Sequence, residues 1–325
     1  MRKNSFKYKN GLPGNKNSSD YGFPGLLLFL LLFWCIFFSC TSGCTEQNEK
    51  ASTTHPLVVA CTIPPQEEFI REVAGDYPVS ILVMVPPGSS PHTFEPTPSQ
   101  IAGLESADLY IALGSGIEFE NRWISRIKQI YPGIKMINLS ENIELYHPSG
   151  SHGEFTEPSQ YNTNERSDPH MWMSLRNAAW IVNTTAEAMA LLRPDMKDSF
   201  FKNKDNYNQK LADADQDIRE SLKNIKTRTI LVYHPAYSYF CRDYDLEQMV
   251  VEENGREPSS RKLADLITRA KSKGINIVFT EPEGSTRQAE TLAREIDGTM
   301  ILISPLDRNY LENMKQIAEK ISGLS

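Results

Sequence analysis

Residues 57–85, LVVACTIPPQEEFIREVAGDYPVSILVMV, contain two apolar strand-like runs with a helical pattern between them. The runs are Leu57–Thr62 and Val79–Val85, and the helical pattern covers residues 65–75. Strand, helix and strand in this order are typical of a parallel pair whose connecting helix lies on one face of the sheet. This stretch therefore predicts an α/β fold.

The same alternation extends along the chain in two series. The first series adds strand-like runs at 108–113 and 134–139, with helical patterns near 98–106 and 117–130. Thr97-Pro98-Ser99-Gln100 has the spacing of a capping box and marks the start of a helix. The second series has strand-like runs at 229–233, 247–251, 275–280 and 299–304, and helical patterns near 236–244, 259–273, 285–296 and 308–322. We expect two Rossmann-like lobes, each with a mostly parallel four-stranded sheet.

A long helical segment separates the two series. Ser174–Leu192 has the pattern of one helix, Pro194 interrupts it, and Asp195–Ile225 then contains neither Gly nor Pro. Its apolar residues are spaced by 7, 4, 7 and 4 and form one stripe, made of Phe200, Tyr207, Leu211, Ile218 and Leu222. An ordinary surface helix would show the same stripe, but the position between two α/β series favours one long rigid helix that joins the lobes. We expect an N-terminal lobe over 56–194, a linking helix over 195–226 and a C-terminal lobe over 227–325.

The N-terminal segment has the layout of an export signal. Five basic residues before position 17 precede the apolar run Leu26–Phe38, and small polar residues follow up to Cys44. Thirteen apolar residues are short for a membrane span, which needs about 20. Thr41-Ser42-Gly43-Cys44 resembles a lipobox, so we expect a lipoprotein-like signal over 1–43, lipid on Cys44 and a polar tether over 44–55. An uncleaved anchor is the alternative, and both place the rest of the chain outside the cytoplasm.

The charge of the chain limits the class of its ligand, and its cysteines are predicted to be free thiols. Five of the 34 basic side chains and one of the 41 acidic ones precede residue 44, so the remainder carries a formal charge of −11. Nucleic acid is excluded as a partner because binding it needs a basic face, whereas a cationic ligand is compatible. Cys61 and Cys241 lie far apart in the predicted elements, and we expect two free, buried thiols.

Three histidines and one glutamate follow predicted strands or precede a predicted helix. His92 lies in the loop after Val79–Val85, His170 just before the helix Ser174–Leu192, His234 directly after 229–233, and Glu281 directly after 275–280. Ligands of open parallel sheets bind beyond the carboxyl ends of the strands. Three imidazoles and an oxygen make a tetrahedral zinc site. Taken singly, a histidine beside Pro at the end of a strand is more often a loop or capping residue than a ligand. Glu281 taken alone more often orients a neighbour or pairs with Arg.

At these positions the sequence resembles the solute-binding receptors of ABC importers for zinc and manganese. The resemblance covers residues 57–322 and is carried by four motifs in order, which are PPGSSPHTFEPTPS (86–99), DPHMWMS (168–174), YHPAY (233–237) and TEPEGSTR (280–287). It implies a pair of α/β lobes joined by one long helix, a divalent metal ion held between them, and delivery to a membrane permease. It also implies a binding protein rather than an enzyme, and we expect a monomer.

The resemblance assigns His92, His170 and His234 as metal ligands, with Zn²⁺ favoured over Mn²⁺ because the third ligand is histidine. The family's fourth ligand is often Asp at the end of the last strand, where this chain has Ser304. Glu281, Asp307 or water is left to supply an oxygen, and Glu281 is equally compatible with holding an imidazole N–H. The polar stretch Tyr146–Ser167 is expected to be a mobile loop, either a weak metal collector or a plain solvated insertion.

Three other functions are compatible with parts of this pattern. A manganese receptor of the same family would use more oxygen ligands. A zinc hydrolase also holds its metal with three histidines and an open position, and Glu281 would be its general base. A receptor for an organic solute would need an aromatic or Arg-lined cleft, to which Trp172, Tyr237 and Tyr239 would contribute.

Overall fold

The computed structural model describes residues 56–147, 167–252, 256–284 and 286–323. These residues belong to one compact unit, residues 54–325. The predicted export signal, the tether with Cys44, and residues 148–166 of the polar stretch lie outside the described residues. Within the described part of the chain, none of the helices combines the length and apolar character that crossing a membrane requires.

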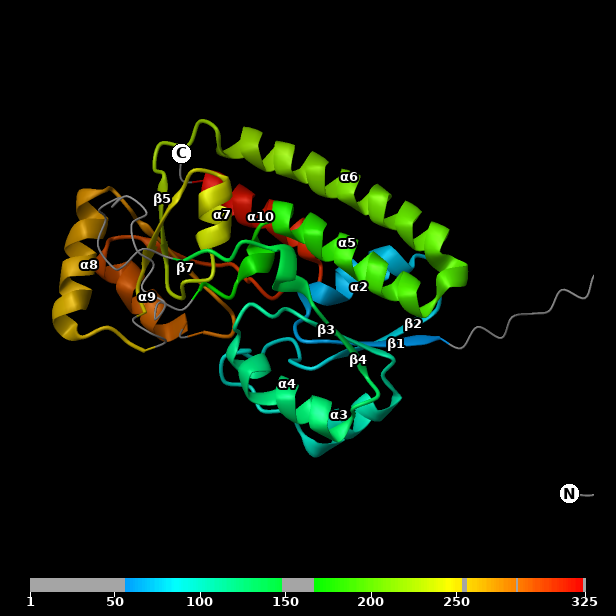
Figure 1. Cartoon of the computed structure of the whole chain (residues 1–325). Helices are drawn as coiled ribbons and strands as arrows, with labels where there is room; N and C mark the ends of the chain where they lie inside the picture. The colour runs from blue at the N-terminus through cyan, green and yellow to red at the C-terminus, as the bar shows by residue number, and fades with distance from the viewer. Residues whose placement is uncertain (1–55, 148–166, 253–255, 285, 324–325) are drawn as a thin grey trace, which may run out of the picture. The chain divides into compact units, whose positions relative to one another are not determined.

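The N-terminal lobe contains one four-stranded sheet in which every pair of neighbouring strands is parallel (Figure 1). The strand order is β2-β1-β3-β4. The elements are β1 (Leu57–Cys61), α2 (Pro65–Ala74), β2 (Val79–Val83), α3 (Pro98–Gly103), η1 (Leu104–Ser106), β3 (Leu109–Ala112), α4 (Glu118–Ile130), β4 (Lys135–Asn138) and η2 (Leu139–Asn142). Side chains of successive strand residues point to opposite faces of the sheet. Val59 packs in the core next to α2, and Ala60 packs in the core next to α3 and α4.

The C-terminal lobe repeats this plan with the strand order β6-β5-β7-β8, again all parallel. Its elements are β5 (Thr229–Val232), α7 (Ser238–Asp243), β6 (Glu247–Val250), α8 (Ser260–Ser272), β7 (Ile277–Thr280), α9 (Thr286–Glu295), β8 (Thr299–Leu302) and α10 (Tyr310–Ser322). Helices α8 and α9 share an apolar cluster on one face of the sheet, and α7 and α10 cover the other. The structure therefore confirms the predicted α/β fold with two parallel four-stranded sheets.

Two long helices that follow the N-terminal sheet in the chain run side by side, α5 (Leu175–Leu192) and α6 (Lys197–Leu222) (Figure 1). The continuous helix α6 is shorter than the predicted range 195–226, because Pro194–Met196 forms the 3-10 turn η4 and the helix ends at Leu222. Its 26 residues span about 39 Å. The predicted stripe on this helix is buried, with exposed fractions of at most 2% for Phe200, Tyr207, Leu211, Ile218 and Leu222.

One hydrophobic core extends through both lobes. It joins α2 and β1 of the N-terminal lobe to α5 and α6, and continues into α7 and α10 of the C-terminal lobe. Cys61 and Cys241 lie in this core, both buried and free, as the sequence predicted. Because the two lobes share apolar packing, the loops at the carboxyl ends of their strands are held at fixed positions relative to one another.

Candidate metal centre

Each of the three predicted histidines stands on a loop whose ends are fixed by regular structure. His92 lies in a turn after β2, and the adjacent carbonyl of Pro91 accepts a hydrogen bond from the amide of Phe119 at the start of α4. His170 immediately precedes the 3-10 helix η3 (Met171–Met173), which leads into α5. His234 follows β5 by two residues. Two histidines thus come from the N-terminal lobe side and one from the C-terminal lobe.

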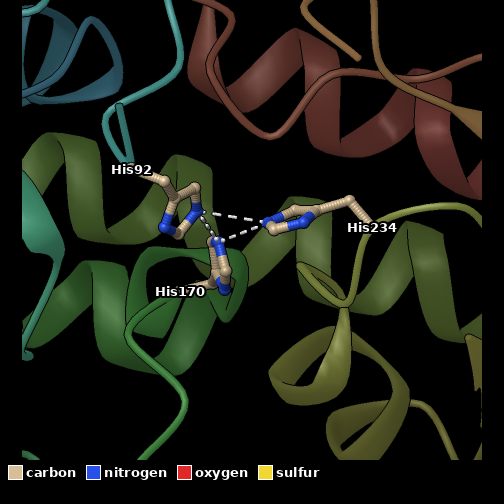
Figure 2. Close-up of side chains that lie close together, drawn as sticks. All are labelled: His92, His170 and His234. Atoms are coloured by element: carbon tan, nitrogen blue, oxygen red, sulfur yellow. Dashed lines mark hydrogen bonds between the residues drawn. The ribbon is translucent and has the colours of Figure 1, made fainter. Parts of the chain in front are cut away.

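The three side chains meet at one point through their Nε2 atoms (Figure 2). The Nε2–Nε2 distances are 3.2 Å between His234 and His92, 3.3 Å between His92 and His170, and 3.3 Å between His234 and His170. A zinc ion holds imidazole nitrogens at about 2.0–2.1 Å, so the edges of its ligand tetrahedron are about 3.3–3.4 Å. The three nitrogens are therefore placed like one face of a zinc tetrahedron.

Each imidazole is held at its other nitrogen by a carboxylate. The Nδ1 of His92 lies 2.6 Å from Glu118 Oε2, and that of His170 lies 2.8 Å from Asp168 Oδ1. The Nδ1 of His234 lies 2.8 Å from Glu252 Oε2. An ionised carboxylate only accepts hydrogen bonds, so each Nδ1 carries the proton and donates. Neutral rings in this tautomer present the lone pairs of all three Nε2 atoms to the same point.

Lone pairs facing one another at 3.2–3.3 Å repel unless a positive charge lies between them. A proton on one Nε2 is only shared between the other two nitrogens, whereas a divalent cation satisfies all three nitrogens together. The three carboxylates behind the rings supply the opposite charge to such a cation. The arrangement is thus preorganised to bind a metal ion, with ring orientation and tautomer set before the ion arrives.

The protein shifts the pKa values of two of these imidazoles in opposite directions. Burial lowers the pKa of His170, and the Asp168 charge only partly offsets this effect. Burial also lowers the pKa of His234, but the hydrogen bond to Glu252 and the charges of Glu281, Glu252 and Asp168 outweigh it, so the net shift is upward. The hydrogen bond from His92 lowers the pKa of Glu118, which keeps this carboxylate ionised.

The position of His170 is fixed by contacts that cross between the lobes. Trp172, fully buried, packs its ring 5.3 Å from the His170 ring and donates from Nε1 to the carbonyl of Pro305 at 2.7 Å. The hydroxyl of Tyr310 donates to the Trp172 carbonyl at 2.7 Å. Tyr239 donates its hydroxyl to the Asp168 carbonyl at 2.9 Å. Trp172 and Tyr239 are thus packing residues around the histidines rather than the walls of an open cleft.

The two candidate side chains for the fourth ligand, and Ser304 at the position of the family's Asp, lie differently. Among the described residues, His92, His170 and His234 form the group of three or more His, Cys, Asp or Glu side chains whose ligand atoms lie within 4.8 Å of one another. Neither Glu281 nor Asp307 belongs to this group. Glu281 is buried directly after β7 and lines a pocket beside His234. Asp307 is exposed, and its Oδ1 accepts a hydrogen bond from the Asn309 amide. The Ser304 Oγ accepts a hydrogen bond from the Leu306 amide.

The sequence motifs contain the three histidines, but they indicate only one of the carboxylate partners. Asp168 had a visible signal, since it lies two residues before His170 in the motif DPH. Glu118 and Glu252 lie 26 and 18 residues from their histidines, and nothing in their spacing distinguishes them from other acidic residues. Their roles follow only from the packing of α4 beside the His92 loop and of β6 beside β5.

Two parallel α/β lobes with facing donor atoms from both lobes define a two-lobed solute-binding protein. The model of the family described as "Zinc-uptake complex component A periplasmic" (ZnuA) matches residues 59–323. The chain belongs to this family.

Individual relatives agree with this assignment. The high-affinity zinc uptake system protein ZnuA of Bacillus subtilis is 28% identical over 296 residues, which cover 86% of this chain and 92% of that protein. The zinc-binding lipoprotein AdcA of Streptococcus pneumoniae is 26% identical over 278 residues, and this chain spans only 54% of its length. A crystal structure of a ZnuA is 32% identical with a TM-score of 0.76, and the match covers 83% of this chain and 99% of that structure.

The named relatives are uptake and binding proteins, not enzymes. This chain is accordingly a solute-binding protein of a zinc-uptake family, and the hydrolase alternative is set aside. A receptor for an organic solute is likewise not what the family describes.

Proposed function

We propose that this chain captures Zn²⁺ between its two lobes, outside the cytoplasm, and delivers it to the membrane permease of an ABC-type importer. The observation that carries the proposal is the set of three Nε2 atoms 3.2–3.3 Å apart, each on a ring whose Nδ1 is held by a carboxylate. Zinc uptake is the activity named for the B. subtilis relative, which supports the same assignment.

In this proposal His92, His170 and His234 bind the ion, and an oxygen atom takes the fourth position. Glu281 is the candidate side chain, because it is buried beside His234 and its Oε1 has no hydrogen-bond partner among the described residues. A water molecule is the alternative. Asp307 has less support, because its side chain is exposed to solvent.

The preference for zinc over manganese follows from the donor atoms. Three neutral imidazole nitrogens suit zinc, whereas Mn²⁺ favours carboxylate, carbonyl and water oxygens. Ser304 replaces the carboxylate that would have made the site richer in oxygen.

We further propose that the chain acts as a monomer anchored to the membrane, by lipid at Cys44 or by its uncleaved N-terminal segment. The sequence Thr41-Ser42-Gly43-Cys44 and the lipoprotein name of the S. pneumoniae relative support the lipid anchor. Mass spectrometry of the protein purified from membranes distinguishes the lipid anchor from the uncleaved anchor. We expect an N-terminal Cys44 that carries lipid, whereas a protein that still begins at Met1 would favour the uncleaved anchor.

Calorimetric titration of the metal-free protein tests the metal assignment. We expect one tight zinc site and much weaker binding of Mn²⁺ in direct competition. His92→Ala, His170→Ala and His234→Ala should each weaken zinc binding strongly, whereas the control Gln216→Ala, an exposed side chain on α6 outside the cluster, should leave it unchanged. Absence of zinc binding, or tighter binding of Mn²⁺, contradicts the assignment.

Delivery to a permease is tested in cells. Deletion of the gene should raise the external zinc concentration that growth requires, and the chain carrying His234→Ala should fail to restore growth at low zinc. If this variant restores growth at low zinc, the histidine site is not required for zinc uptake.

A further inference from the structure

A polar pocket that includes His234 is lined mainly by residues of the C-terminal lobe. Its volume is about 100 Å³, which is room for several water molecules or a hydrated ion. It lies beyond the carboxyl ends of β5 and β7, and it is lined by Ser90, Tyr233, His234, Glu252, Thr280, Glu281, Glu283 and Gly284. His234 belongs to both places, because its Nε2 faces the other two histidines while its Nδ1 donates to Glu252.

Three oxygen atoms of the residues that line this pocket have no hydrogen-bond partner among the described residues. They are the Thr280 Oγ1, the Glu281 Oε1 and the Glu283 Oε2. Thr280 is 2% exposed and Glu281 is 9% exposed. A buried polar atom without a partner destabilises the fold, and more so when it carries charge, so three such atoms at the end of β7 and in the turn after it indicate a common partner.

The charge of the residues that line the pocket indicates what kind of ligand it binds. Three carboxylates line it, and among its described lining residues none is a lysine or arginine. One of them, Glu252, accepts a hydrogen bond from His234. The missing partner is therefore a positive charge that accepts oxygen donors.

We propose that this pocket is a second cation site, in which the Glu281 and Glu283 carboxylates and the Thr280 hydroxyl bind a divalent ion through oxygen atoms alone. Hard divalent cations such as Mn²⁺, Ca²⁺ and Mg²⁺ take such ligands. The site is distinct from the three imidazoles, and it takes Glu281 when water, the alternative fourth ligand named above, completes the zinc site. It rests on the proposed function in that zinc occupies the histidines. A cation bound here lies beside His234, which lines the same pocket, and it offsets the acidic charge next to the zinc ion.

Titration of the zinc-loaded protein with Mn²⁺, followed by electron paramagnetic resonance of the free ion, tests the proposal. With zinc on the histidines, the protein should bind one further Mn²⁺ per chain. Glu283→Gln and Thr280→Val should each weaken this second binding roughly tenfold or more, since affinity at oxygen sites follows ligand number and charge. Zinc affinity and stoichiometry of both variants should stay at the wild-type value, which also shows that they fold.

The matched control is Glu290→Gln, which removes one exposed carboxylate from α9 and should leave both sites intact. In His92→Ala the tight zinc site should be lost while Mn²⁺ still binds in the pocket, so failure of the zinc assignment and failure of this inference give different results. The proposal is overturned if the zinc-loaded protein binds no further Mn²⁺, or if Glu283→Gln and Thr280→Val bind Mn²⁺ as tightly as the wild type does. It is also overturned if the added Mn²⁺ displaces zinc from the protein.

Discussion

Asp168 and His170 are joined by two hydrogen bonds to one oxygen atom. The Asp168 Oδ1 accepts from the backbone amide of His170 and from its Nδ1, both at 2.8 Å. The carboxylate thus fixes the turn that carries the histidine and the orientation of the ring with one contact. Both residues are almost fully buried, so water cannot replace the contact if it is lost.

Replacement of this carboxylate should weaken zinc binding without removing a ligand. In Asp168→Asn, an amide competes for the position of the acceptor oxygen, so the His170 tautomer that exposes Nε2 is no longer enforced. We expect zinc affinity to fall about 10- to 100-fold, as for other carboxylates behind metal-bound histidines. Calorimetric titration measures the change. Asp198→Asn, an exposed Asp on α6, is the control, and equal affinity of the two variants would contradict the role given to Asp168.

Zinc binding should weaken in acid, and Glu252 should set where the decline begins. Zinc requires a neutral His234, and the hydrogen bond to Glu252 helps raise the pKa of His234 above its ordinary value. Protons therefore compete at His234 from a higher pH than they would at an unperturbed histidine. Glu252→Gln lowers that pKa and should move the onset of the decline to lower pH, while affinity at pH 8 falls because the ring is less firmly oriented.

The measurement is zinc affinity from pH 5 to pH 8 in the wild type and in Glu252→Gln, with Glu290→Gln as the control for loss of one carboxylate. The prediction would be wrong if the decline in zinc affinity began at a higher pH in Glu252→Gln than in the wild type. Affinity that is constant over the whole range would contradict histidine ligation itself.

Zinc should stabilise the folded chain, because the three imidazoles meet only when both lobes are in place. At a free zinc concentration 100 times the dissociation constant, the gain is about 2.7 kcal/mol. For a folded body of this size we expect Tm to rise by roughly 5–10 °C. Calorimetric melting with zinc and with excess chelator measures the difference. His234→Ala should melt at the same temperature in both conditions, and a zinc-dependent rise in this variant would place the stabilising ion elsewhere.

The linking helix should contribute to stability through its buried stripe. Leu211 is 2% exposed and packs in the core that both lobes share. Leu211→Ala should lower the free energy of unfolding by about 2–5 kcal/mol in a denaturant titration. Gln216→Ala, an exposed position on the same helix, should change it by less than about 0.5 kcal/mol. Similar values for the two variants would mean that α6 is not packed as described.

Local patterns in the sequence predicted local structure well. The capping box at Thr97 is present, with the Gln100 amide donating to the Thr97 Oγ1 and the Thr97 amide donating to the Gln100 Oε1. The strand and helix patterns of both series match the two sheets within a few residues at each end. The extent of the linking helix was less accurate, because Pro194 begins a 3-10 turn whose side-chain pattern does not differ from that of a helix.

By itself, the sequence determined the α/β class, the two series of strands, the stripe of the linking helix and the four motifs that hold the candidate ligands. These features depend on hydrophobic periodicity and on neighbouring residues, which are readable along one chain. Only the tertiary structure decided that His92, His170 and His234, which lie 64 to 142 residues apart, bring their Nε2 atoms within 3.3 Å. It also decided that Glu118 and Glu252 hold two of the rings and that the unpaired oxygen of Glu281 lies in a neighbouring pocket. The reason is that side-chain distances between the lobes are set by the packing of their shared core, which no short stretch of sequence encodes.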